Sequence, residues 1–286
     1  MKLSIITINY NNAEGLRKTM ESVLAQTYTE IEYIIVDGAS TDGSVDVIRE
    51  LATRPTIKWV SEKDTGIYNA MNKGIRMATG EYIQILNSGD ILAAPDVTER
   101  MFQAMASYSE QSERSTGEAE LQQSDLPTIL YGNMIKVNAQ GKVVGKSGYT
   151  EYSLRQFYSS TLNHDCAYIR RDLFEEYGLY DENLKIVSDW KWYLQAIGLG
   201  KVKPEYVDID VTIFDDGGIS ETNLALRNAE RRKVLEEVLP PAMLWDYDTH
   251  AFEMEQMKRL GRWHLYGLVY FMERVCFKFE KWFCRR

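Results

Sequence analysis

Polar and charged residues follow each of the first apolar segments of this sequence. These clusters are NYNN at 9–12, DGASTDGS at 37–44, SEKDTGIYNAMNKG at 61–74 and NSGD at 87–90. If the apolar segments are parallel strands, their carboxyl ends share one sheet edge, which gathers Asp37, Asp64, Lys73 and Asp90. Carboxylates with one lysine suit a bare phosphate poorly unless a divalent cation bridges them to it. Together the clusters predict a site for a metal and a nucleotide diphosphate, although DGASTDGS alone is more typical of a turn with a helix N-cap.

Short apolar segments alternate with amphipathic helical patterns through the first 90 residues. The predicted strands, rich in β-branched and aromatic residues, are 3–8, 31–37, 57–62 and 81–86. The predicted helices, with apolar residues three and four apart, are 13–26, 44–53 and 67–79. This alternation predicts an α/β fold with a mainly parallel, right-handed sheet and ligands at the carboxyl ends of its strands.

The rest of the sequence predicts a hairpin, short helices and a helical extension. Residues 107–127 are polar and lack a period, so we expect a flexible, solvated loop there. The elements expected after it are a hairpin at 128–145, helices at 172–178 and 189–200, a strand at 206–215 and a helix at 223–239. We expect one domain over 1–222 and a C-terminal helical extension over 223–286.

The composition narrows the class of protein. A chain of 286 residues that is 44% hydrophobic can bury a large core, and its formal charge of −9 disfavours nucleic acid as the main partner. Its three cysteines form no C-x-x-C pair, which disfavours a disulfide framework or a structural zinc site and fits a reducing cytoplasm. We expect no signal peptide, because the N-terminal apolar run has five residues at most and no small-residue cleavage pattern follows it. We expect no membrane-spanning helix, because no uninterrupted apolar run reaches about 18 residues.

Several segments together resemble the family 2 glycosyltransferases. They are SIITINYNN, SVLAQTYTEIEYIIVDGASTDGS, EKDTGIYNAMNKGIRMATGEYIQILNSGD and HDCAYIRRDLFEEYGLYDENLKIVSDWKWYL, and they cover residues 1 to about 220 in consistent order. The resemblance implies the GT-A fold, which binds nucleoside-diphosphate sugars, and sugar transfer with inversion at the anomeric carbon. It also implies that Ile8 and Tyr10 wrap the nucleotide base, that Asp37 holds the base, that Asp64 lines the nucleotide pocket and that Lys73 contacts the diphosphate. For Lys73, a solvated helix lysine is an equal alternative.

The resemblance assigns the metal and the donor phosphates to two further segments. Asp90 matches the metal-binding carboxylate of the D-x-D-like motif, so Mg²⁺ or Mn²⁺ is expected. Relatives often carry DADD where this chain has NSGD, and Asn87 and Gly89 thereby remove two carboxylates and weaken the expected cation affinity. His164 stands where relatives commonly have HQ. Contact with the donor diphosphate, a place in the metal shell and a hydrogen-bonded core role all remain open for it.

An inverting transfer needs a general base that takes the proton of the attacking acceptor hydroxyl. In KIVSDWKWYL, the resemblance places the catalytic carboxylate at Asp189, whose alternative is an ordinary acid in the first turn of a helix. Trp190 is expected either to stack on an acceptor sugar or to belong to the core. The FDDGGIS segment at 214–220 resembles the glycine-rich loop that covers the donor.

Basic and aromatic residues interleave from 257 to 286, a composition typical of helices in a membrane interface. The alternative is a helix packed on the catalytic domain or on a second subunit. We predict a cytoplasmic enzyme, peripheral on the inner face of the membrane, that transfers a sugar from a UDP-sugar to a glycan acceptor in cell-surface polysaccharide biosynthesis. The acceptor is either a free or a lipid-linked glycan. The alternatives are a sugar-phosphate nucleotidyltransferase, which should show an arginine-containing phosphate loop after the first strand, and a non-catalytic nucleotide-sugar binder.

Overall fold

The computed structural model describes residues 1–116, 126–138, 140–148, 152–215 and 222–249. By internal contacts the chain divides into a unit over Met1–Arg232 and a second over Lys233–Arg286. This division falls within the last described long helix, whereas the sequence placed the domain boundary at residue 222. The cavity residues described below all belong to the first unit.

The strands and helices of the first half follow the predicted alternation. They are β1 (Leu3–Asn9), α1 (Ala13–Leu24), β2 (Ile31–Asp37), α2 (Ser44–Leu51), β3 (Ile57–Ser61), α3 (Ile67–Met77), β4 (Tyr82–Ile85), β5 (Ile91–Leu92) and α4 (Val97–Thr116). The second half comprises β6 (Ile129–Val137), β7 (Val143–Ser147), α5 (Leu154–Ser159), η2 (His164–Cys166), β8 (Ala167–Arg170), α6 (Leu173–Glu176), α7 (Ser188–Tyr193), η3 (Leu194–Leu199), β9 (Glu205–Asp215) and α9 (Leu224–Val238). Among the described helices, none is long and apolar enough to cross a bilayer.

Nine strands of the described chain form one sheet, in the order β3-β2-β1-β4-β8-β6-β9-β5, with β7 paired to β6. The pairs among β1 to β4 are parallel, as predicted, and the later strands β5, β7 and β8 pair antiparallel. Every residue of β1 is buried, which fits a strand at the centre of the sheet. The α/β class and the predicted hairpin of β6 and β7 are therefore confirmed.

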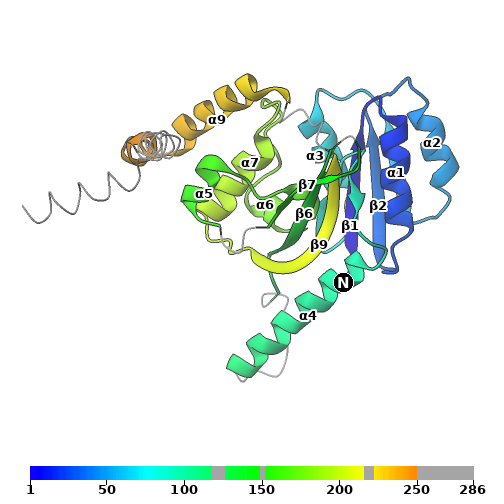
Figure 1. Cartoon of the computed structure of the whole chain (residues 1–286), viewed down its shortest axis with the longest axis horizontal. Helices are drawn as coiled ribbons and strands as arrows, with labels where there is room; N and C mark the ends of the chain where they lie inside the picture. The colour runs from blue at the N-terminus through cyan, green and yellow to red at the C-terminus, as the bar shows by residue number, and fades with distance from the viewer. Residues whose placement is uncertain (117–125, 139, 149–151, 216–221, 250–286) are drawn as a thin grey trace, which may run out of the picture. The chain divides into compact units, whose positions relative to one another are not determined.

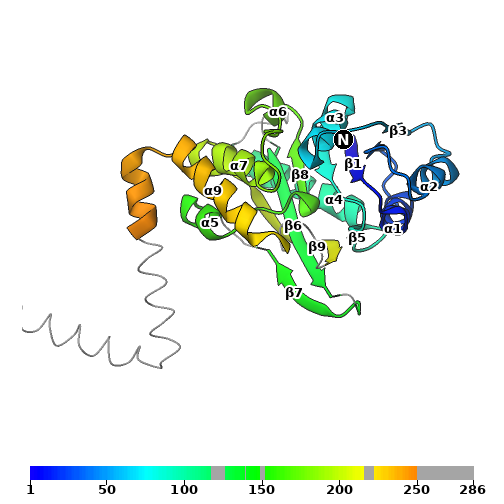
Figure 2. The same cartoon turned by 90° about the horizontal axis from the view of Figure 1, so that it is seen from above.

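The strand order determines which face each early helix covers. The chain runs from β1 through β2 to β3 and then returns to β4 on the other side of β1. Right-handed crossovers then place α1 and α2 on one face of the sheet and α3 on the opposite face, as Figures 1 and 2 show. The connections after β1 and β4 diverge at this reversal, and such a switch point is where open α/β sheets bind ligands.

One prediction about the first unit was wrong. Residues 107–116, expected to lie in a flexible loop, form the second half of α4, which extends to Thr116. The first half of α4 buries Val97, Met101 and Met105 at four-residue spacing, so it is anchored to the core. The continuation has no such apolar face, but glutamate, glutamine and arginine favour the helix by themselves. Residues 117–125 of the expected loop lie outside the described part of the chain.

Candidate active site

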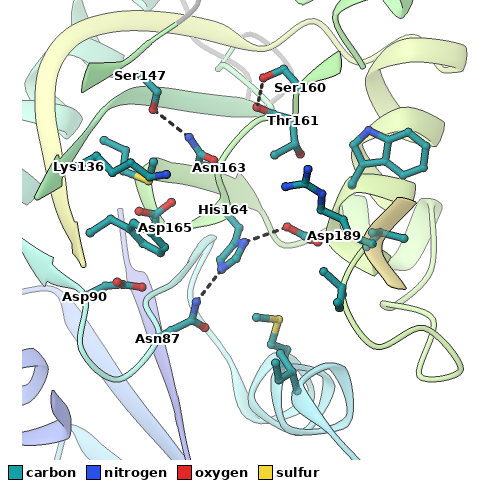
Figure 3. A pocket seen from close by; sticks show the side chains of 18 of the residues that line it. Asn87, Asp90, Lys136, Ser147, Ser160, Thr161, Asn163, His164, Asp165 and Asp189 are labelled. Atoms are coloured by element: carbon teal, nitrogen blue, oxygen red, sulfur yellow. Dashed lines mark hydrogen bonds and ion pairs between the residues drawn. The ribbon is translucent and has the colours of Figure 1, made fainter. Parts of the chain in front are cut away.

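A cavity of about 450 Å³ opens at the carboxyl ends of the strands. The NSGD segment after β4, the His164 segment and the start of α7 all contribute to its wall (Figure 3). The predicted site residues that line it are Asn87, Asp90, His164, Asp189 and Trp190. The fold therefore brings together five residues that were predicted from the sequence, which come from three separate segments up to about a hundred positions apart.

A chain of hydrogen bonds crosses the floor of this cavity. The Asn87 Nδ2 atom lies 3.1 Å from His164 Nε2, and His164 Nδ1 lies 3.2 Å from Asp189 Oδ2. On the other oxygen of the same carboxylate, the Tyr68 hydroxyl donates to Asp189 Oδ1 at 2.8 Å. Asp189 is thus held from two sides, by α3 and by the His164 segment, and its orientation in the cavity is fixed.

The electrostatics of this chain favour an ionised Asp189. Burial alone would raise the pKa of Asp189, but the hydrogen bond and charge of His164 and the hydrogen bond from Tyr68 lower it overall. Burial likewise opposes the charged form of His164, and its hydrogen bond to Asp189 and the nearby carboxylates raise the pKa of His164 overall. A carboxylate has about four lone-pair positions, of which Tyr68, His164 and the Trp190 N–H use up to three, so Asp189 can still accept a proton from a bound hydroxyl.

Tyr68 is a residue of this hydrogen-bond chain that the sequence analysis did not single out. Burial, and then the charge of Asp189, raise the pKa of Tyr68 well above its ordinary range, so the phenol keeps its proton and acts as a donor. Its signal in the sequence was its place inside the third polar cluster, in the first turn of α3. Its partner lies 121 residues away, which no local pattern reveals.

The NSGD segment presents oxygen atoms that fit a hard cation. Asp90 is 5% exposed and lines the cavity. Within the described chain, Asn87 Oδ1 is a buried oxygen without a hydrogen-bond partner. Among the described residues no group of three or more His, Cys, Asp or Glu could hold a metal ion. Asp90 and Asn87 can therefore hold Mg²⁺ or Mn²⁺ only together with ligands from a diphosphate and water, which is how Mg²⁺ commonly binds.

Gly89 has a structural reason to be a glycine. Its φ of +111° lies in the region that favours glycine, so a carboxylate residue at this position would be strained. Thr19 fixes the same turn, because its hydroxyl donates to the Asp90 carbonyl at 2.7 Å and accepts from the Gly89 N–H at 2.9 Å. This turn, rather than a row of carboxylates, positions Asp90.

Asp165, the residue after His164, lines the same cavity. Its Oδ2 accepts the Thr212 hydroxyl at 2.8 Å, and burial raises the pKa of the Asp165 carboxyl. The residue that departs from the usual glutamine of relatives is therefore tied to β9. It adds to the negative charge that favours a protonated His164.

The residues predicted for the nucleotide base lie at the ends of β1 and β2, outside the lining of this cavity. Tyr10 is 67% exposed. A Cβ on Gly38 would lie 3.1 Å from the Tyr10 ring and 2.6 Å from Asp64 Oδ2, so a larger residue at 38 would require these side chains to shift. Ile8 is buried in β1. These contacts place an exposed ring and a carboxylate side by side, and the base-binding role remains a prediction.

Asp37 is fully buried in this structure. Its carboxylate accepts from Asn9 Nδ2 at 2.8 Å, from the Ser61 hydroxyl at 2.6 Å and from the Ser40 N–H at 3.0 Å. Burial would raise the pKa of Asp37, but these hydrogen bonds lower it overall. Asp37 therefore positions the loop after β2, and its direct contact with a base stays a prediction.

Two predicted contacts are not supported by the geometry. The Lys73 ammonium pairs with Glu62 at 2.7 Å and donates to the Lys63 carbonyl at 3.0 Å, and Lys73 does not line the cavity. Trp190 is 2% exposed, and its Nε1 donates to the Phe157 carbonyl at 2.7 Å. The core alternative for Trp190 thus describes it better than a platform for a sugar ring, because almost none of the ring is open to a ligand.

Two further predictions concern residues outside the described part of the chain. They are the greater part of the glycine-rich segment, 216–221, and the basic aromatic segment at 257–286. Both remain predictions from the sequence.

Comparisons with known proteins identify the family. The Glycosyl transferase family 2 model matches residues 4–178. An uncharacterized glycosyltransferase of Mycobacterium tuberculosis is 32% identical over 200 residues, covering 68% of each chain. A PGL/p-HBAD biosynthesis glycosyltransferase of Mycobacterium bovis is 26% identical over 222 residues, covering 77% of this chain and 79% of the relative. The chain therefore belongs to glycosyl transferase family 2.

Solved structures support the GT-A fold. S. aureus TarS 1-349 in complex with UDP matches with a TM-score of 0.59 at 18% identity, over 85% of this chain and 68% of that one. This chain spans 41% of the longer TarS chain. The mannosyltransferase PcManGT of Pyrobaculum calidifontis, in complex with GDP-Man and Mn²⁺, matches with a TM-score of 0.54 at 20% identity, over 80% of this chain and 61% of that one. At these identities the likeness concerns the fold.

Proposed function

We propose that this glycosyltransferase is an inverting enzyme that uses a nucleoside-diphosphate sugar, in the first place a UDP-sugar, and a divalent cation. The observation that carries the proposal is the Asp189 carboxylate, held ionised between Tyr68 and His164 in the cavity that Asp90 also lines. The arrangement supplies a base at one end of the cavity and oxygen ligands for a cation at the other. TarS with UDP and PcManGT with GDP-Man and Mn²⁺ support a donor of this class.

In the proposed reaction, an acceptor hydroxyl attacks the anomeric carbon of the donor sugar. The new carbon–oxygen bond forms as the bond to the diphosphate breaks, so the diphosphate leaves with the electron pair and the configuration inverts. Asp189 takes the hydroxyl proton, while Tyr68 and His164 keep its carboxylate in place. A cation at Asp90 and Asn87 would supply electrostatic stabilisation of the leaving diphosphate.

A panel of UDP- and GDP-sugars, assayed for nucleoside diphosphate release with and without EDTA, tests this function. Asp189→Asn should reduce transfer by about 10²- to 10⁴-fold and leave nucleotide binding intact. Asp46→Asn is the matched control, because Asp46 is an exposed residue of α2 far from the cavity lining. Normal turnover by Asp189→Asn would remove this residue from the mechanism.

The same panel separates the alternatives. The single carboxylate of NSGD keeps a non-catalytic binder open, and such a protein would bind UDP or GDP but release neither from any sugar donor. Membership of glycosyl transferase family 2 does not favour the nucleotidyltransferase alternative.

We also propose, from the sequence, a cytoplasmic enzyme that is peripheral on the inner face of the membrane through residues 257–286, with a lipid-linked acceptor in cell-surface polysaccharide biosynthesis. A homodimer remains an open alternative for that segment.

A further inference from the structure

Basic residues from α9 and from the loop before α7 line one wall of the cavity. They are Arg227, Arg231 and Lys185. Within the described chain, the Lys185 ammonium makes a long hydrogen bond of 3.4 Å to the Thr65 carbonyl. The proposed chemistry of Asp189 and Asp90 gives these three cations no role.

Glu230 fixes this basic wall to the loop that precedes α7, the helix in which the proposed base Asp189 lies. Its Oε1 accepts the Lys185 N–H at 2.7 Å and its Oε2 accepts the Ile186 N–H at 2.9 Å, and Glu230 is 8% exposed. Arg227 and Arg231 are three residues before and one residue after Glu230, so all three lie on one face of α9. The arginines therefore hold a defined position relative to Asp189, which follows three residues after Ile186.

The Arg231 guanidinium is partly buried, and one of its N–H groups lacks a hydrogen-bond acceptor within the described chain. Its guanidinium carbon lies 5.1 Å from the centre of the Trp190 ring, and its buried Nε has no hydrogen-bond partner within the described chain. Burial, and then the charge of Arg227, lower the pKa of Arg231, although Asp189 opposes this. Holding two guanidinium groups together in a partly buried wall costs free energy, which an anion between them would offset.

The position of the wall favours the acceptor over the donor. Asp90 and Asp189 lie on opposite sides of His164 (Figure 3). The Arg231 guanidinium lies over the ring of Trp190, the residue that follows Asp189. In an inverting displacement the acceptor oxygen and the leaving diphosphate lie on opposite sides of the reacting carbon. If the diphosphate lies at Asp90, the acceptor lies beside Asp189, where these cations are.

We propose that Arg231, Arg227 and Lys185 bind an oxyanion carried by the acceptor, a phosphate or a carboxylate, next to the hydroxyl that attacks. This inference rests on the proposed function and assigns the acceptor to the anionic class. Guanidinium groups suit it because they donate two parallel hydrogen bonds to either oxyanion. Trp190, buried beneath Arg231, supports the guanidinium in place of stacking on a sugar.

Calorimetry on the full-length protein tests the inference. UDP and GDP are first titrated with Mg²⁺, and the nucleotide that binds is kept saturating so that the donor phosphate site is filled. The probes are glucose 1-phosphate, glucuronic acid and methyl glucoside, which carry a phosphate, a carboxylate and no charge. Failure of both nucleotides to bind would count against the proposed function, whereas the probes test the anion site by itself.

We expect the saturated protein to bind at least one anionic probe at least tenfold more tightly than methyl glucoside. Arg231→Gln should lower the affinity for that probe by about tenfold or more and leave the affinity for the nucleotide unchanged. Arg231→Lys should retain part of the affinity for the probe. Arg232→Gln is the matched control, since this exposed neighbour does not line the cavity. Unchanged thermal unfolding of the variants shows that they fold.

Two results would overturn the inference. One is equal binding of charged and neutral probes by the saturated wild-type protein. The other is a loss of nucleotide affinity in Arg231→Gln, which would assign the arginine to the donor diphosphate.

Discussion

Replacing Tyr68 with phenylalanine removes one hydrogen bond from the proposed base and little else. The Tyr68 hydroxyl donates to Asp189 Oδ1 at 2.8 Å, and the ring itself is buried beside the ring of Tyr180. A hydrogen bond to a charged group contributes about 1.5 to 3 kcal/mol. Its loss disfavours the ionised carboxylate by roughly tenfold to a hundredfold in the protonation equilibrium.

The assay is the pH dependence of kcat/KM for sugar transfer. Because Tyr68 lowers the pKa of Asp189, Tyr68→Phe should raise that pKa, and the acidic limb of the profile should move to higher pH. At neutral pH most of the carboxylate stays ionised, so activity there should fall less than in Asp189→Asn. The remaining hydrogen bond from His164 keeps one oxygen in place.

Tyr180→Phe is the matched control for this experiment. The Tyr180 hydroxyl is also buried, but it has no hydrogen-bond partner within the described chain. Its removal should leave the acidic limb where it is in the wild-type protein. If Tyr68→Phe lost activity at every pH without moving the limb, Tyr68 would be a packing residue and the reasoning about Asp189 would be refuted.

Three other perturbations follow from the same charges and contacts. Asp189→Asn should lower the pKa of His164, because the carboxylate that favours the imidazolium is removed. An NMR titration of the imidazole signals measures this, since the chain has only three histidines. An unchanged titration of His164 would contradict its pairing with Asp189. Burial would raise the pKa of Glu32, but hydrogen bonds from a lysine, a serine and a threonine lower it to about 2. Glu32→Gln should therefore lower the free energy of unfolding at pH 7 by on the order of 2 kcal/mol, with the difference fading in denaturant titrations as the pH falls from about 4.5 to about 2. Lys278→Glu with Lys281→Glu should weaken co-sedimentation with anionic phosphatidylglycerol vesicles by about 2 kcal/mol or more, and unchanged binding would exclude these lysines from membrane contact.

The site residues that could be predicted from the sequence are marked by the residues next to them in the chain, either by the end of an apolar strand or by a segment that resembles the family. Asp90 follows a buried apolar strand, and parallel strands deliver their polar ends to one edge, so strand order was not needed to place it. His164 and Asp189 came from the family resemblance rather than from periodicity. In the structure both line the cavity together with Asp90, and their roles remain predictions.

The parts that could not be predicted depend on packing between distant segments. In the sequence, nothing distinguishes Arg231 from the other charged residues of α9. Only the fold shows that it lies over Trp190. Lys73 follows a strand-end cluster just as Asp90 does, but α3 turns its ammonium toward Glu62. A helix presents each side chain every 100° around its axis, so spacing from a cluster does not determine which way a lysine points.

The amide of Asn87 gives the departure from DADD a physical meaning. Asp189 is an acceptor, so His164 Nδ1 carries the proton between them, and Asn87 Nδ2 faces Nε2, which then accepts. This orientation leaves Asn87 Oδ1 available to a cation. Protonating Nε2, which the raised pKa of His164 favours, requires the amide to turn and give that oxygen to the imidazolium. An aspartate at 87 could not donate to Nε2 and would favour a charged His164, whereas asparagine can donate to the neutral imidazole and still present Oδ1 to the proposed cation.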